Sequence, residues 1–103
     1  MNDQANFQSK FYEADSLLVQ ARQAYKLKNY EKVIHYCEYI LIFLEQYLSQ
    51  KPELHLVQKK VLEILFTTWL WMGRAYHRLG EEKSSQRCFD KEKYFLIKLY
   101  ETK

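Results

Sequence analysis

Glycine and proline are scarce in this chain, which holds two glycines and one proline among its 103 residues. Sandwiches and barrels need many tight turns, and those turns depend on these residue types. Their scarcity predicts long helices joined by short connections. Apolar residues make up 48% of the chain, enough for one modest hydrophobic core. We therefore expect a single all-α domain spanning residues 1–103, without intrinsic disorder.

Helical periodicity divides the chain into four segments. Apolar residues recur at i, i+3 and i+4 spacing within about residues 6–27, 30–48, 52–79 and 81–100. Lys28-Asn29 separates the first two segments, and Pro52 starts the third because proline suits the first helical turn. Gly80 ends the third because glycine accepts the left-handed conformation found after helix ends. The pattern predicts four antiparallel helices arranged as two helical hairpins.

Gly73 stands inside the third helical segment, where a glycine costs about 1 kcal/mol relative to alanine. The residues around it follow this register: Trp69, Met72, Gly73, Tyr76, Leu79, Gly80, Ser85 and Phe89. The register resembles the tetratricopeptide repeat, a pair of antiparallel helices. In that family the glycine lets the two helices approach closely. The resemblance implies that the helix beginning near Glu81 packs against Gly73.

A second, weaker copy of this register lies in the N-terminal half. It comprises Leu17, Ala21, Ala24, Leu27, Tyr30, Val33, Cys37 and Ile40, with Ala21 in the place of Gly73. The resemblance then gives repeat-like units of about residues 14–48 and 53–100. The copies are offset by 52 residues rather than about 34, so the second and third helices must be elongated. Ser85, Glu92 and Ile97 also depart from the alanine, alanine and proline that the family favours.

No residue pattern in the sequence indicates an enzyme. The histidines His35, His55 and His77 stand on different predicted helices without metal-ligand spacing. The sequence also lacks a phosphate-binding glycine loop, a nucleophile elbow and a carboxylate pair in apolar surroundings. We expect no catalysis, no cofactor and no bound metal.

Neither the apolar runs nor the cysteines indicate a membrane or an oxidising compartment. The longest apolar run is Tyr39–Leu44, far below the roughly 20 residues of a membrane span. The polar N-terminus has no signal-peptide pattern. Cys37 and Cys88 suit small buried side chains in a reducing environment. We expect a cytoplasmic protein without a membrane partner.

The resemblance also implies a binding groove, because the first helix of each repeat lines such a groove in the family. Its positions correspond here to these candidate binding residues: Leu18, Val19, Arg22, Tyr25, Lys26, Leu70, Trp71, Arg74, His77 and Arg78. Tryptophan and arginine often dominate the binding energy of interfaces. A groove with these cations and apolar anchors favours an acidic protein or peptide segment with one or two bulky apolar residues. The expected function is a non-enzymatic adaptor or scaffold.

Several alternatives remain open beside the groove. The register could belong to a plain four-helix bundle, in which Leu70 and Trp71 pack against the elongated second helix. The segments YILIFLEQYL and YFLIKLY offer more apolar surface than two hairpins readily bury, which favours a homodimer or a purely structural self-associating bundle. Basic clusters and a net charge of +3 allow weak nucleic-acid binding, but interleaved acidic residues disfavour it.

Overall fold

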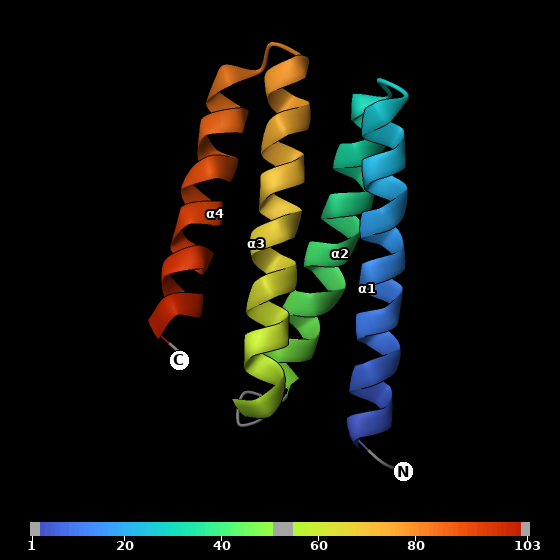
Figure 1. Ribbon diagram of the computed structural model, residues 1–103, viewed down its shortest axis with the longest axis vertical. Helices are drawn as coiled ribbons and strands as arrows, with labels where there is room; N and C mark the ends of the chain where they lie inside the picture. Colours follow the sequence, from blue (N-terminus) through green and yellow to red (C-terminus); the bar gives the residue numbers. More distant parts are fainter. Residues whose placement is uncertain (1–2, 51–54, 102–103) are drawn as a thin grey trace.

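The computed structural model describes residues 3–50 and 55–101, and the side chains of residues 9–46 and 59–101. It contains four helices: α1 (Asp3–Lys26), α2 (Tyr30–Gln50), α3 (His55–Arg78) and α4 (Glu82–Glu101). No strand occurs in the described part of the chain. The prediction of an all-α fold with four antiparallel helices is confirmed (Figure 1).

The helices run up and down along the long axis of the molecule, so that both hairpin turns lie at the same end (Figure 1). In this view α4, α3 and α1 follow one another across the front, and α2 crosses behind them. The central helix is α3, whose backbone contacts α1, α2 and α4. Both α2 and α4 pack on α3, but their backbones do not contact each other.

The helix ends lie within a few residues of those predicted, which is the usual uncertainty of such boundaries. The first helix begins at Asp3 rather than near residue 6, and α2 continues to Gln50 rather than residue 48. The helices end at Lys26 and Arg78, each one residue early, because Leu27 and Leu79 already belong to the turns. Pro52, the predicted start of the third helix, lies outside the described residues.

Gly80 ends α3 in the manner that the sequence predicts. Its φ of 78° is left-handed, and its N–H donates to the carbonyl of His77 at 3.0 Å. The N–H of Glu81 donates to the carbonyl of Tyr76 at 2.9 Å. These two bonds form a Schellman motif, which satisfies carbonyls that the helix end would otherwise leave without donors.

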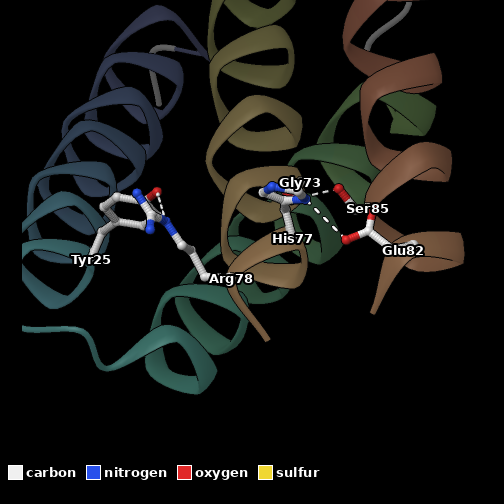
Figure 2. Close-up of polar contacts among 6 residues, drawn as sticks. All are labelled: Tyr25, Gly73, His77, Arg78, Glu82 and Ser85. Atoms are coloured by element: carbon white, nitrogen blue, oxygen red, sulfur yellow. Dashed lines mark hydrogen bonds and ion pairs between the residues drawn. The ribbon is translucent and has the colours of Figure 1, made fainter. Parts of the chain in front are cut away.

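At Gly73, α3 and α4 approach each other closely. A Cβ atom added to Gly73 would lie 2.8 Å from Cε1 of Phe89 and 3.1 Å from Cβ of Cys88. Directly beside it, the hydroxyl of Ser85 donates a hydrogen bond to the Gly73 carbonyl at 3.0 Å (Figure 2). The expectation that α4 packs closely against Gly73 is therefore confirmed, and Ser85 adds a polar contact to it.

The hydrophobic core is centred on α2 and α3. The largest fully buried side chains are Ile40, Leu44, Val33, Val61, Thr68 and Cys37. The hydroxyl of Thr68 donates to the carbonyl of Ile64 at 2.7 Å, so this buried polar group is satisfied within its own helix. Cys37 and Cys88 are buried free thiols, as their expected role as small core residues requires.

Candidate functional site

A groove with a volume of about 390 Å³ runs between α1 and α3, and we call it the α1–α3 groove. Its lining side chains are Asp15, Leu18, Val19 and Arg22 from α1, and Lys60, Glu63, Ile64, Thr67 and Trp71 from α3. Each set recurs at about i, i+3 or i+4, and i+7, which places its members on one face of their helix. The groove thus lies between the first helices of the two hairpins.

Each wall of the groove carries one acidic and one basic residue. Leu18 and Ile64 are buried beneath the groove, whereas Val19 is half exposed along its edge. An ion pair joins the helices where Lys60 Nζ lies 3.6 Å from Oδ2 of Asp15. Both side chains of this pair are nearly half exposed, so it contributes about 0–1 kcal/mol.

At the end of the groove near the hairpin turns lies a group that we call the Trp71 cluster, formed by Tyr25, Trp71, Arg74 and Arg78. The Tyr25 and Trp71 rings meet edge to face with centroids 5.3 Å apart. The Arg74 guanidinium lies 4.9 Å from the centroid of the Trp71 ring, which is a cation–π contact. Arg78 Nε donates to the Tyr25 hydroxyl at 3.1 Å (Figure 2). That hydrogen bond raises the pKa of the Arg78 guanidinium above its ordinary value.

The structure brings together most of the residues that the sequence singled out. Leu18, Val19, Arg22 and Trp71 line the α1–α3 groove. Tyr25, Arg74 and Arg78 complete the Trp71 cluster at its end. Lys26 is exposed in the last turn of α1, the turn that also holds Tyr25.

Leu70 and His77 lie elsewhere. His77 Nδ1 is 3.0 Å from Oε1 of Glu82, so this side chain faces α4 and not α1 (Figure 2). Leu70 is half-buried, and it precedes Gly73 by three residues and His77 by seven. That spacing places Leu70 on the stripe of α3 that faces α4. The structure therefore separates these two residues from the groove.

Sequence reasoning missed five lining residues: Asp15, Lys60, Glu63, Ile64 and Thr67. The signal that could have found them is helical spacing. Asp15 precedes Leu18 by three residues, and Thr67 precedes Trp71 by four. Adding these residues changes the character of the groove, because two carboxylates lie among the cations that were expected.

In comparisons with protein-family models, with curated proteins and with solved structures, nothing matches this chain. Among the described residues, no helix is both long and apolar enough to cross a membrane. The same part of the chain contains no group of three histidine, cysteine or acidic side chains that could hold a metal ion. Fold and site together define an all-helical protein with a mixed-charge groove that ends in an aromatic and basic cluster.

Proposed function

We propose that this protein is a non-enzymatic protein–protein interaction module of the tetratricopeptide type, and that its α1–α3 groove holds an acidic, apolar-anchored segment of a partner. The observation that carries the proposal is the Trp71 cluster. It presents a half-buried tryptophan that contacts exposed Arg74 and the ring of Tyr25, to which exposed Arg78 is hydrogen-bonded. Tryptophan and arginine at the centre of such a surface are the residues that most often carry binding energy.

Charge favours an acidic ligand at this end of the groove. Arg22, Lys26, Arg74 and Arg78 are all exposed there, whereas the acidic groups Asp15 and Glu63 lie further along the groove. A carboxylate of the ligand can form a bidentate pair with an arginine, which adds direction as well as attraction. The same two acidic groups disfavour a nucleic-acid backbone, which needs an uninterrupted run of cations.

The two tryptophans make the proposal directly measurable. Trp71 lines the α1–α3 groove, and Trp69 lines a different cleft, so a Trp69→Phe variant keeps one tryptophan at the groove. Titrating this variant with a short peptide of alternating Glu and Leu should change the Trp71 emission and saturate. A peptide with Lys in place of Glu is the matched control and should not bind.

Charge reversal should then remove the binding. We expect the double variant Arg74→Glu, Arg78→Glu to reduce the affinity for the Glu–Leu peptide by about tenfold or more. An effect of this size is typical of interface hot spots. Arg87→Glu, an equally exposed reversal on α4, should leave the affinity unchanged. Equal binding of the Glu and Lys peptides, or no effect of the double reversal, would contradict the proposal.

The C-terminal half of α4 supports a second proposal, that two copies of the chain associate. Tyr94, Leu96 and Ile97 are between 36% and 53% exposed on that half. Exposed apolar side chains that gather on one part of a surface mark sites where proteins associate. Light-scattering chromatography across a wide dilution range should give a dimer for the wild type and a monomer for Ile97→Lys. The control is Leu27→Lys, which replaces an exposed apolar side chain in the turn between α1 and α2. This variant should remain dimeric.

A further inference from the structure

A second cleft lies on roughly the opposite face of α3 from the α1–α3 groove. It has a volume of about 350 Å³ and opens between α2 and α4, which pack on α3 without backbone contact with each other. We call it the α2–α4 cleft. Trp69, Met72 and Tyr76 of α3 line it at i, i+3 and i+7 spacing. Neither the groove nor the proposed dimer surface uses these three side chains.

The floor of the α2–α4 cleft is apolar. Leu41, Met72 and Cys88 are buried beneath it, and Trp69 and Tyr76 are half-buried along it. A volume near 350 Å³ is at the lower end of what protein clefts offer to ligands. It accommodates a few bulky side chains that project from one face of a partner, not a folded domain.

The two walls of the cleft differ in charge. On α2, Glu38, Ile42 and Glu45 recur at i, i+4 and i+7, so two carboxylates flank an isoleucine that is 60% exposed. On α4, Arg87 stands on the facing wall. Within the described part of the chain, no ion pair joins Glu38, Glu45 or Arg87 to another side chain. These three charges are available to a ligand.

The negative charge of Glu38 on α2 acts on the floor of the cleft. Burial, and after it the negative charge of Glu38, raise the pKa of the Tyr76 hydroxyl above its ordinary value. A cation placed beside Glu38 would therefore find an attractive potential. The acidic wall and the apolar floor together favour a ligand that is basic and apolar. The proposed ligand of the α1–α3 groove is acidic instead.

We infer that the α2–α4 cleft docks an amphipathic helix of a partner protein, with apolar residues against Trp69 and Met72 and a basic edge along α2. Glu38 and Glu45 are seven residues apart, which is about 10 Å along the helix axis. Cations two turns apart on a helix lying alongside α2 match that spacing. An acidic residue on its other edge faces Arg87. Such a helix lies across α2 and α4, and the apolar side chains of one face fill the space between them.

The two helical walls of the cleft favour a helix as the ligand. Both are helices whose outward side chains form ridges, and a third helix packs its own ridge into the groove between them. Helix-in-groove recognition uses apolar anchors at i, i+3 or i+4, and i+7, the same repeat that the floor residues of α3 show. An extended strand gains less here, because the cleft offers no sheet edge for its backbone to pair with.

Trp69 is the reporter for this cleft. A Trp71→Phe variant leaves it as the one tryptophan, and we would titrate that variant with a designed alanine-rich helix. The probe carries leucines at i, i+4 and i+7, two lysines seven positions apart on one flank, and a glutamate on the other. Saturable change of the Trp69 emission is expected. Glu38→Lys with Glu45→Lys should weaken binding by at least about tenfold, as loss of two ion pairs at an interface implies.

Two matched controls make the result specific. Glu63→Lys reverses an exposed carboxylate of the α1–α3 groove and should leave the affinity for the probe unchanged. A probe with glutamates in place of its two lysines should bind the Glu38→Lys, Glu45→Lys variant better than it binds the wild type. All substituted charges are exposed, and circular dichroism of each variant checks that the helices persist.

Three outcomes would overturn the inference. They are no saturable change of Trp69 emission, equal weakening by Glu63→Lys, and equal binding of the two probes to the double variant. A fourth concerns the occupant: if Glu38→Lys with Glu45→Lys abolishes dimers of the chain without any probe, the cleft holds a second copy and not a partner helix. The two binding surfaces report through different tryptophans and different charges, so failure of one experiment leaves the other intact.

Discussion

The α1–α2 and α3–α4 hairpins are closed by the same backbone hydrogen bonds, 52 residues apart. In the first, the N–H of Lys28 donates to Tyr25 and that of Asn29 to Ala24, at 3.0 and 2.9 Å. In the second, the N–H groups of Gly80 and Glu81 make the equivalent bonds at the same two distances. Two copies of one turn are therefore built from different residues. Their geometry is set by the backbone and not by any one side chain.

Each turn places one favourable residue beside one unfavourable residue. Lys28 adopts a left-handed φ of 61°, where glycine is preferred, but Asn29 after it caps α2 by accepting the Lys32 N–H at 3.4 Å. In the second turn Gly80 takes the left-handed position without strain, and Glu81 takes the cap position, for which glutamate is a poor choice. The difference teaches that a turn tolerates one unfavourable position when its neighbour compensates.

The largest expected effect on stability concerns Gly73 of α3, and the comparison is with Ala21, the equivalent residue of α1. Gly73→Ala should lower the free energy of unfolding by about 1–3 kcal/mol, because overpacking against Phe89 and Cys88 outweighs the gain in helix propensity. Ala21→Gly at the equivalent position of α1 should also destabilise, by about 1–2 kcal/mol, through the loss of helix propensity and of a fully buried methyl group. Urea denaturation measures both.

A double-mutant cycle tests the cause. In a Phe89→Leu background, the ring that blocks the added Cβ is absent, so Gly73→Ala should cost less or even stabilise. A stabilising effect of Gly73→Ala in the otherwise unchanged protein would show that α3 and α4 have room to move apart.

The next effect concerns the left-handed positions. Lys28→Gly should raise the free energy of unfolding by about 1 kcal/mol, because a residue with a Cβ atom is strained at positive φ. Gly80→Ala should lower it by a similar amount, and only through the backbone, since no atom lies within 4 Å of the added Cβ. Thermal or urea unfolding of both variants gives the comparison, and shifts of the same sign would contradict it.

Smaller effects are expected at the helix caps. Asn29→Ala should destabilise by about 0.5–1 kcal/mol through loss of the bond to the Lys32 N–H. Glu81→Asn should stabilise by about the same amount, because asparagine at that position can accept a bond that glutamate does not make well. The ion pair of His77 and Glu82 is largely exposed and contributes little to either result. A cap effect confined to one hairpin would show that the turns are not equivalent.

At neutral pH the smallest expected effect is that of the two buried thiols, because it develops only above pH 9.0. Burial raises the pKa of Cys37 to about 12 and that of Cys88 to about 11, against an ordinary 9.0. Folded thiols therefore keep their protons where unfolded ones lose them, so their contribution to stability is complete below pH 9.0 and falls as the pH rises from there towards 11–12.

The stability of Cys37→Ala and Cys88→Ala, followed from pH 8 to 11, should decline less steeply with pH than that of the wild type. In the folded protein at pH 8, a thiol reagent should leave Cys37 and Cys88 largely unmodified. Rapid modification of either thiol under native conditions would contradict its burial.

Much of the fold could be predicted because its signals are local. Apolar spacing marks each helix, and Gly80 marks the end of α3 through its own conformational freedom. The start of α1 was predicted too late because the polar residues before Phe7 show no apolar period, although the helix includes them from Asp3. The close approach at Gly73 could be predicted because only a neighbouring helix explains a glycine in that place.

Less of the site could be predicted, for a geometric reason. A groove between two helices depends on how each is rotated about its axis, and one helix's sequence does not contain that information. Adjacent residues differ by about 100° around a helix. That is why Arg78 reaches Tyr25 on α1 while His77 turns to Glu82 on α4. The α2–α4 cleft could not be predicted at all, because it arises where two helices fail to meet.

The mixed charges of the α1–α3 groove make its affinity for an acidic ligand sensitive to ionic strength in two opposite ways. Salt screens charges over about 10 Å at 0.1 M, so it weakens the attraction between an acidic ligand and Arg22 or Arg74. Salt equally weakens the repulsion between that ligand and the carboxylates of Asp15 and Glu63, which line the same groove. The affinity of the groove should therefore decline with salt more gently than its cations alone would dictate.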